Sequence, residues 1–149
     1  MNTYQHTQPG VLLRIALGIP AAILLAVIVF IPQQSRLVME IVAIILVLSL
    51  ILFHSLTVSI DEKYLRLRMG VGLIRIKFKI SDIVQAYPVK NKWYLGWGIH
   101  LTGKGFLYNV SGFDAVEIVL ASGSIHRIGT DEPSVLTQAI NQSISSQHN

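Results

Sequence analysis

The sequence predicts an α-helical transmembrane hairpin followed by a mainly-β domain, a PH-like antiparallel barrel of about seven strands capped by a C-terminal helix. Three observations predict this fold class. Two long apolar runs lie near the N-terminus, the residues after position 56 alternate between apolar and polar, and one amphipathic segment ends the chain. The chain has 149 residues. We therefore expect a tail and hairpin in residues 1–56 and one folded domain in residues 57–149, which is long enough to bury a core.

The two apolar runs cover residues 11–31 and 37–56. At a rise of ~1.5 Å per residue, each helix would reach ~30 Å, the thickness of a bilayer's hydrocarbon core. The first run contains Arg14 and Pro20, and the second contains Glu40 near its start. A short polar link between the runs predicts two antiparallel spans. The first run is longer than the apolar core of a signal peptide, so we expect it to remain as a span.

The distribution of basic residues predicts the orientation of the hairpin. Lys63, Arg66, Arg68 and Arg75 follow the second run, whereas the link carries only Arg36. Because basic residues near span ends favour the cytoplasmic side, we expect both termini in the cytoplasm. The sequence thus predicts a multi-pass protein of the bacterial cytoplasmic membrane. The chain has no cysteine, which excludes disulfides and thiolate metal sites.

Small residues recur along the first run. Gly18, Ala22 and Ala26 are spaced four apart, so they share one helix face. Small side chains at this spacing let a neighbouring helix approach closely. We expect this face to pack against the second run, with dimerisation of two chains as the alternative.

Alternation with a period of two begins at Thr57 and indicates half-buried strands. The expected strands cover residues 57–60, 64–69, 74–80, 83–89, 98–102, 106–110, 115–120 and 124–128. Gly70-Val71-Gly72 predicts a hairpin turn between the second and third of these strands, since glycine adopts positive φ freely. A helix over residues 131–145 carries one apolar stripe, and we expect it to cover an open end of the barrel. That stripe consists of Leu136, Ala139, Ile140 and Ile144.

Several short motifs resemble those of small bacterial membrane proteins with a pleckstrin-homology-like domain. The motifs are GWGIH at residues 96–100, FLYNVSG at 106–112, AVEI at 115–118 and IGTDEP at 128–133. The resemblance implies one or two N-terminal spans and a cytoplasmic PH-like barrel, in a family that is largely uncharacterised. An arginine is usual in that family where this chain has His100. PH-type barrels bind headgroups and peptides, so the resemblance also implies a binding module.

A cationic hairpin is the first candidate site. The segment from Tyr64 to Lys104 holds eight basic residues and one acidic residue. Five of them should project from one face of two adjacent strands: Arg66, Arg68, Arg75, Lys77 and Lys79. Each basic group near an anionic membrane surface contributes about 1 kcal/mol. Membrane lipids are therefore one expected partner, and a protein partner or a homo-oligomer is another. A plain solvated sheet face is the structural alternative, and we expect no nucleic acid.

The loop around Trp93 and Tyr94 also contains lysines, a composition typical of the headgroup level of a bilayer. The alternative is that Trp93 only covers a loop. Asp114 and Glu117 look like solvated strand ends, and the five histidines are dispersed. No arrangement points to catalysis, a metal or a cofactor. The sequence therefore predicts a non-enzymatic membrane protein that binds headgroups or a protein partner. A structural subunit that assembles through its spans is the alternative.

Overall fold

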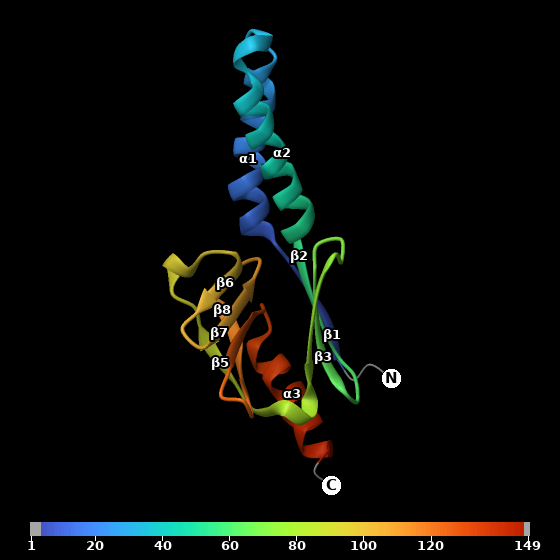
Figure 1. Ribbon diagram of the computed structural model, residues 1–149. Coiled ribbons are helices and arrows are strands. Elements are labelled where there is room, and N and C mark those ends of the chain that lie inside the picture. Colours follow the sequence, from blue (N-terminus) through green and yellow to red (C-terminus); the bar gives the residue numbers. More distant parts are fainter. Residues whose placement is uncertain (1–3, 148–149) are drawn as a thin grey trace.

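The computed structural model describes residues 4–147 and places a helical hairpin on one end of a two-sheet domain (Figure 1). The hairpin consists of α1 (Val11–Ile28), a short link with the 3-10 turn η1 (Gln33–Ser35), and α2 (Leu37–Phe53). By length and composition, α1 can cross a membrane. With 17 residues, α2 is apolar but shorter than predicted. It ends early because Leu56, expected in the helix, already belongs to the following strand.

The first sheet has the order β1-β2-β3-β4 and is antiparallel throughout. Its strands are β1 (Tyr4–Pro9), β2 (Ser55–Ile60), β3 (Tyr64–Met69) and β4 (Ile74–Lys79). The prediction of an N-terminal tail over residues 4–9 is wrong, because these residues form β1. Pro9 lies opposite Ser55 in the β1–β2 pair. The hairpin is therefore an insertion between two paired strands, and residues before it belong to the β domain.

The second sheet has the order β5-β8-β9-β7-β6. Its strands are β5 (Ile83–Lys90), β6 (Gly98–Thr102), β7 (Gly105–Asn109), β8 (Asp114–Leu120) and β9 (Ile125–Gly129). The predicted strands of this sheet are confirmed within about two residues at each end. The closed antiparallel barrel is not found, since β7 and β9 pair in parallel and no strand pair joins the two sheets within residues 4–147. The 3-10 turn η2 (Ile80–Asp82) separates β4 from β5 and ends the pairing there.

One apolar core fills the space between the sheets and α3 (Pro133–Gln147). Both sheets contribute alternate side chains to it, for example Leu65 and Leu67 from β3 and Val116 and Ile118 from β8. The predicted stripe of the C-terminal helix is confirmed. Its residues Leu136 and Ile140 are fully buried, and Ala139 and Ile144 pack against the core.

Direct hydrogen bonds join the two helices at the base of the hairpin, where it leaves the first sheet. The Gly10 N–H donates to the His54 carbonyl oxygen over 2.8 Å. The Arg14 guanidinium donates twice to the same oxygen, over 3.2 and 3.0 Å, at the C-terminal end of α2. A Cβ on Gly10 would lie 2.9 Å from that oxygen, so only glycine permits this approach. A single residue joins each helix to its strand: Gly10 lies between β1 and α1, and His54 lies between α2 and β2.

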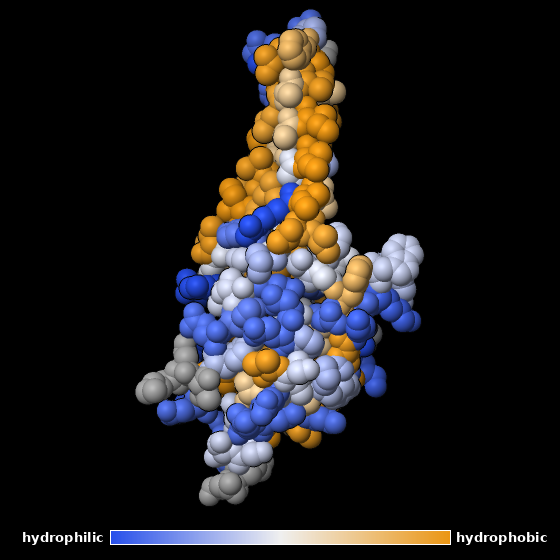
Figure 2. Space-filling model, turned by 180° about the vertical axis from the view of Figure 1, so that it is seen from behind, coloured by the Kyte–Doolittle hydropathy of each residue, from blue (hydrophilic) through white to orange (hydrophobic). Residues whose placement is uncertain are grey.

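Seen from behind, the molecule divides sharply by hydropathy (Figure 2). Apolar side chains cover the surface of α1 and α2, and polar side chains cover most of the two-sheet part. Most large side chains of both helices are exposed, including Ile19, Ile23, Ile41 and Ile44. The hairpin is thus an apolar column without a protein partner in the described chain.

Candidate anion-binding face

Strand alternation places the five predicted cations on the outer face of the first sheet. In β3, Leu65, Leu67 and Met69 are buried, so Arg66 and Arg68 point outward. Neighbouring β4 has the same alternation. We call the set Arg66, Arg68, Arg75, Lys77 and Lys79 the cationic face.

The strand register places like charges directly opposite one another. Arg66 faces Lys77, and Arg68 faces Arg75. Like charges in such cross-strand pairs are destabilising, by a few tenths of a kcal/mol to about 1 kcal/mol. This repulsion lowers the stability of the sheet, and burial of the apolar side chains on the opposite face does not require it.

Only part of this charge is compensated within the protein. The Arg66 guanidinium lies 2.6 Å from the Asp61 carboxylate and 5.4 Å from the centre of the Tyr64 ring. Burial opposes ionisation of Asp61, but backbone N–H groups of Lys63 and Tyr64 and the Arg66 charge lower its pKa below the ordinary value. Within residues 4–147, no ion pair is found for the other four cations: Arg68, Arg75, Lys77 and Lys79.

A groove of about 390 Å³ runs across this face. Its lining adds the polar side chains of Gln5 from β1 and of Thr57 and Ser59 from β2 to the guanidinium groups. The Thr57 hydroxyl already bonds to that of Thr7, over 2.9 Å. Hydroxyl, amide and guanidinium donors on one surface suit the oxygens of a phosphate or a carboxylate. The groove therefore has the chemistry of an anion-binding site.

The cationic face is edge-on to the helical hairpin: one end of its strands lies near the helices, and the other end lies far from them. The turn between β3 and β4 reaches the base of α2, and the strands run away from it (Figure 1). Arg68 and Arg75 form the row nearest this turn, whereas Lys79 is four residues farther along β4. At ~3.3 Å per residue, Lys79 lies ~13 Å farther from the helices than Arg75. The five cations are therefore at graded distances from the end that carries the hairpin.

The structure does not bring Trp93 to the cationic face. Trp93 lies in the 3-10 turn η3 (Trp93–Leu95) between β5 and β6, on the opposite flank of the domain from β3 (Figure 1). Its side chain is 80 % exposed. Trp97, close by, is half-buried and donates to the Gly112 carbonyl over 3.3 Å. Trp93 and Trp97 therefore differ in role: the first is exposed on the surface, and the second fixes the loop.

The small-residue stripe of α1 does not pack against α2. Ala22 and Ala26 are exposed, and nothing lies within 4 Å of a Cβ built on Gly18. The buried small residues are instead Ala21 in α1 and Ala43 in α2. The expected packing within the chain is therefore wrong, since the interface uses the neighbouring helix face.

Sequence reasoning missed a buried ion pair on the outer face of the second sheet. Glu117 was expected at a solvated strand end, yet its side chain is 8 % exposed. The Arg127 guanidinium lies 2.6 Å from its carboxylate, and the Tyr87 hydroxyl donates to the same carboxylate. The three residues stand opposite one another on β5, β8 and β9. Strand pairing, which the sequence does not state, creates this cluster.

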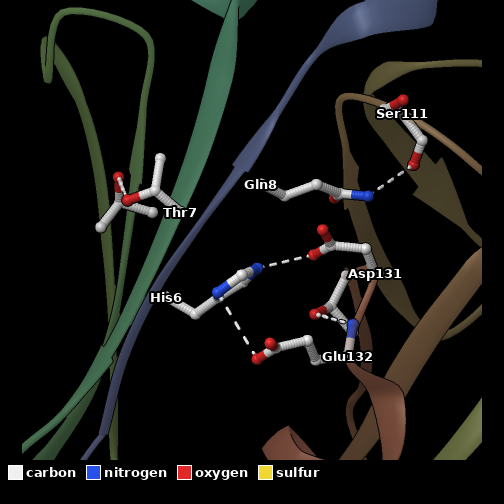
Figure 3. Close-up of polar contacts among 8 residues, drawn as sticks. His6, Thr7, Gln8, Ser111, Asp131 and Glu132 are labelled. Atoms are coloured by element: carbon white, nitrogen blue, oxygen red, sulfur yellow. Dashed lines mark hydrogen bonds and ion pairs between the residues drawn. The ribbon is translucent and has the colours of Figure 1, made fainter.

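A second group of polar contacts ties β1 to the segments that follow β7 and β9 (Figure 3). The His6 imidazole lies 2.7 Å from the Asp131 carboxylate and 3.5 Å from that of Glu132. The amide of Gln8 donates to the Ser111 carbonyl over 3.1 Å. Burial, with the nearby charges of Glu132 and Asp131, raises the pKa of Tyr4 to about 12. Among residues 4–147, no group of three or more His, Cys, Asp or Glu side chains is arranged to hold a metal ion.

The fold thus defines a class of protein: an apolar helical hairpin inserted between two strands of a two-sheet α+β domain. Comparison with protein-family models, curated proteins and solved structures found no match to this chain.

Proposed function

We propose that this chain is a non-enzymatic, two-span protein of the bacterial cytoplasmic membrane that holds a PH-like domain against the cytoplasmic surface, where the cationic face binds anionic lipid headgroups. The observation that carries this proposal is the Arg68–Arg75 pair. In the strand register the two residues lie directly opposite each other, in the cationic row nearest the helices, and no acidic partner of either is found within residues 4–147. An anionic headgroup would relieve their repulsion.

Two features support placing the helices in a bilayer. Only 11 % of α1 is buried in the protein, whereas the core helix of a water-soluble domain is mostly buried. An apolar hairpin of this length otherwise exposes its side chains to water. The basic residues that follow α2 support a cytoplasmic domain. Lipid binding then needs no diffusion, because the hairpin keeps the cationic face beside the membrane.

The test uses the full chain in nanodiscs with equal amounts of phosphatidylserine and phosphatidylcholine. Native mass spectrometry after release gives the ratio of the two lipids that remain bound. We expect an excess of phosphatidylserine that decreases as salt is raised. The excess should disappear when all five cations are replaced by glutamine. An equal ratio for the wild-type chain would reject headgroup binding and would leave a protein partner as the ligand of this face.

The alternative is a structural subunit that assembles through its spans. The stripe of Gly18, Ala22 and Ala26 favours it, because Ala22 and Ala26 are exposed and a Cβ built on Gly18 would meet nothing within 4 Å. Replacing Gly18 and Ala22 with leucine should then break a complex in the membrane. The headgroup proposal predicts no effect of these changes on the lipid ratio.

A further inference from the structure

The turn between β3 and β4 packs against the last turn of α2. The Gly70 N–H donates to the Ser55 carbonyl over 2.8 Å. A Cβ built on Gly70 would lie 2.3 Å from the carbonyl oxygens of both Ile51 and Leu52. Gly70 also has a φ of +51°, in the left-handed region. The turn is thus held at the level of Ile51 and Leu52, beside the helix and without a spacer.

This turn has an apolar, exposed tip. Val71 is 60 % exposed and Leu73 is 76 % exposed. No charged residue occurs from Met69 to Ile74, while Arg68 and Arg75 flank the segment on both strands. The turns at the far end of the domain are polar by contrast, as in Asp61-Glu62-Lys63 and Ser122-Gly123. An apolar tip occurs where the turn meets the helices.

The polar boundary of the hairpin fixes the depth of this tip. The Arg14 guanidinium and the His54 carbonyl meet at the base of the helices. Ile51 and Leu52 lie two to three residues closer to the middle of α2 than His54. That is ~3–4.5 Å along the helix axis. A turn at their level therefore reaches the polar boundary of the span or passes it.

We propose that the β3–β4 turn inserts Val71 and Leu73 into the boundary between headgroups and acyl chains, beside the cytoplasmic end of α2. The partner of this tip is the lipid bilayer itself. The inference rests on the membrane placement proposed above. It adds the β3–β4 turn as a third point of attachment to the membrane, besides the helices α1 and α2. It explains why an apolar tip has cations immediately below it: Arg68 and Arg75 then lie at headgroup level. The insertion also holds the two sheets at a fixed angle to the membrane.

The absence of native cysteine permits a direct test with single spin labels. Four variants of the full chain are reconstituted in phosphatidylcholine vesicles: Val71→Cys, Leu73→Cys, Ser122→Cys and Ile44→Cys. Power saturation compares collisions with oxygen, which concentrates in the bilayer, and with nickel-EDDA, which stays in water. Neutral lipid is used so that the outcome does not depend on the cationic face. Ser122 is exposed in the far turn, and Ile44 is exposed on α2.

We expect oxygen collisions to exceed nickel collisions at positions 44, 71 and 73, with the reverse at position 122. Water-like accessibility at both 71 and 73, with lipid-like accessibility at 44, overturns the insertion and leaves the membrane anchor intact. Water-like accessibility at 44 overturns the anchor itself, and the insertion with it. Using two tip positions guards against a variant that fails to fold, since either label alone reports the depth of the turn.

Discussion

The graded distances along the cationic face make a quantitative prediction possible. We consider two double variants with the same change in charge: Arg68→Gln/Arg75→Gln and Lys77→Gln/Lys79→Gln. The first removes the row beside the β3–β4 turn, and the second removes cations that lie farther along β4. Both leave Arg66 and its Asp61 partner in place. If the face stands on edge, the first variant should lose far more headgroup binding.

The magnitude follows from the strand geometry. A cation at headgroup level contributes about 1 kcal/mol, so losing both arginines costs about 2 kcal/mol and lowers the bound lipid ratio about 30-fold. Lys77 and Lys79 lie two and four residues beyond Arg75, or ~7 and ~13 Å at ~3.3 Å per residue. With a Debye length of ~8 Å, their contributions fall to ~0.4 and ~0.2 kcal/mol. Losing both lysines should therefore lower the ratio only about threefold.

The assay is the competition of phosphatidylserine with phosphatidylcholine for the full chain, read by native mass spectrometry at two salt concentrations. Thermal unfolding in micelles checks that both double variants keep the fold. Equal losses in the two variants would refute the edge-on arrangement, because they would mean that the whole face lies flat on the membrane. A larger loss for the lysine variant would refute the depth order of the strands.

Three further predictions concern stability, measured as the thermal midpoint of the full chain in micelles. Gly70→Ala should destabilise by at least about 2 kcal/mol through positive φ and a backbone clash, whereas Gly103→Ala, with nothing within 4 Å, should be nearly neutral. Arg127→Met should cost about 3 kcal/mol, because it leaves the buried Glu117 carboxylate without a cation and with only the Tyr87 hydroxyl as a partner; adding Glu117→Leu should recover most of the loss, and no recovery would contradict the pairing. Burial lowers the pKa of His126 in the folded chain below its ordinary value of 6.5. As the pH drops below about 7, the unfolded chain therefore binds a proton more readily than the folded chain does, and the stability should fall. His126→Phe should abolish this acid dependence.

Local patterns predicted the elements well where burial has a simple period. Alternation identified β3 and β4 and placed all five cations on one face, because a period of two depends only on which side is buried. The stripe of Leu136 and Ile140 identified the face of α3 for the same reason. Those features depend on near neighbours in the chain, so the sequence contains them.

Features that depend on partners across the chain were missed. The segment of β1 contains Gln5, His6, Thr7 and Gln8, which give no apolar alternation. Its stability as a strand comes from pairing with β2 and from contacts with Asp131 and Ser111, far along the chain. The closed barrel was expected because strand number alone does not determine whether sheet edges meet. The Gly18 stripe was assigned to the α1–α2 interface because spacing gives a shared face but not its neighbour.

The place of the hairpin between β1 and β2 has a functional consequence. A slip of one residue between these strands would turn Gln8 from the core to the surface, so their register is strongly fixed. Arg14 and Gly10 fix both helices to the same His54 carbonyl. The cationic face belongs to the same sheet, and so it cannot swing away as it could on a flexible linker. If the helices span a membrane, as proposed, its reach is limited to that membrane. A fragment of residues 57–149 would lack β1, the strand that pairs with β2, so the full chain is needed to test this fold. Under that proposal, an anion bound at Arg68 and Arg75 comes from the same bilayer surface or from a partner already beside it.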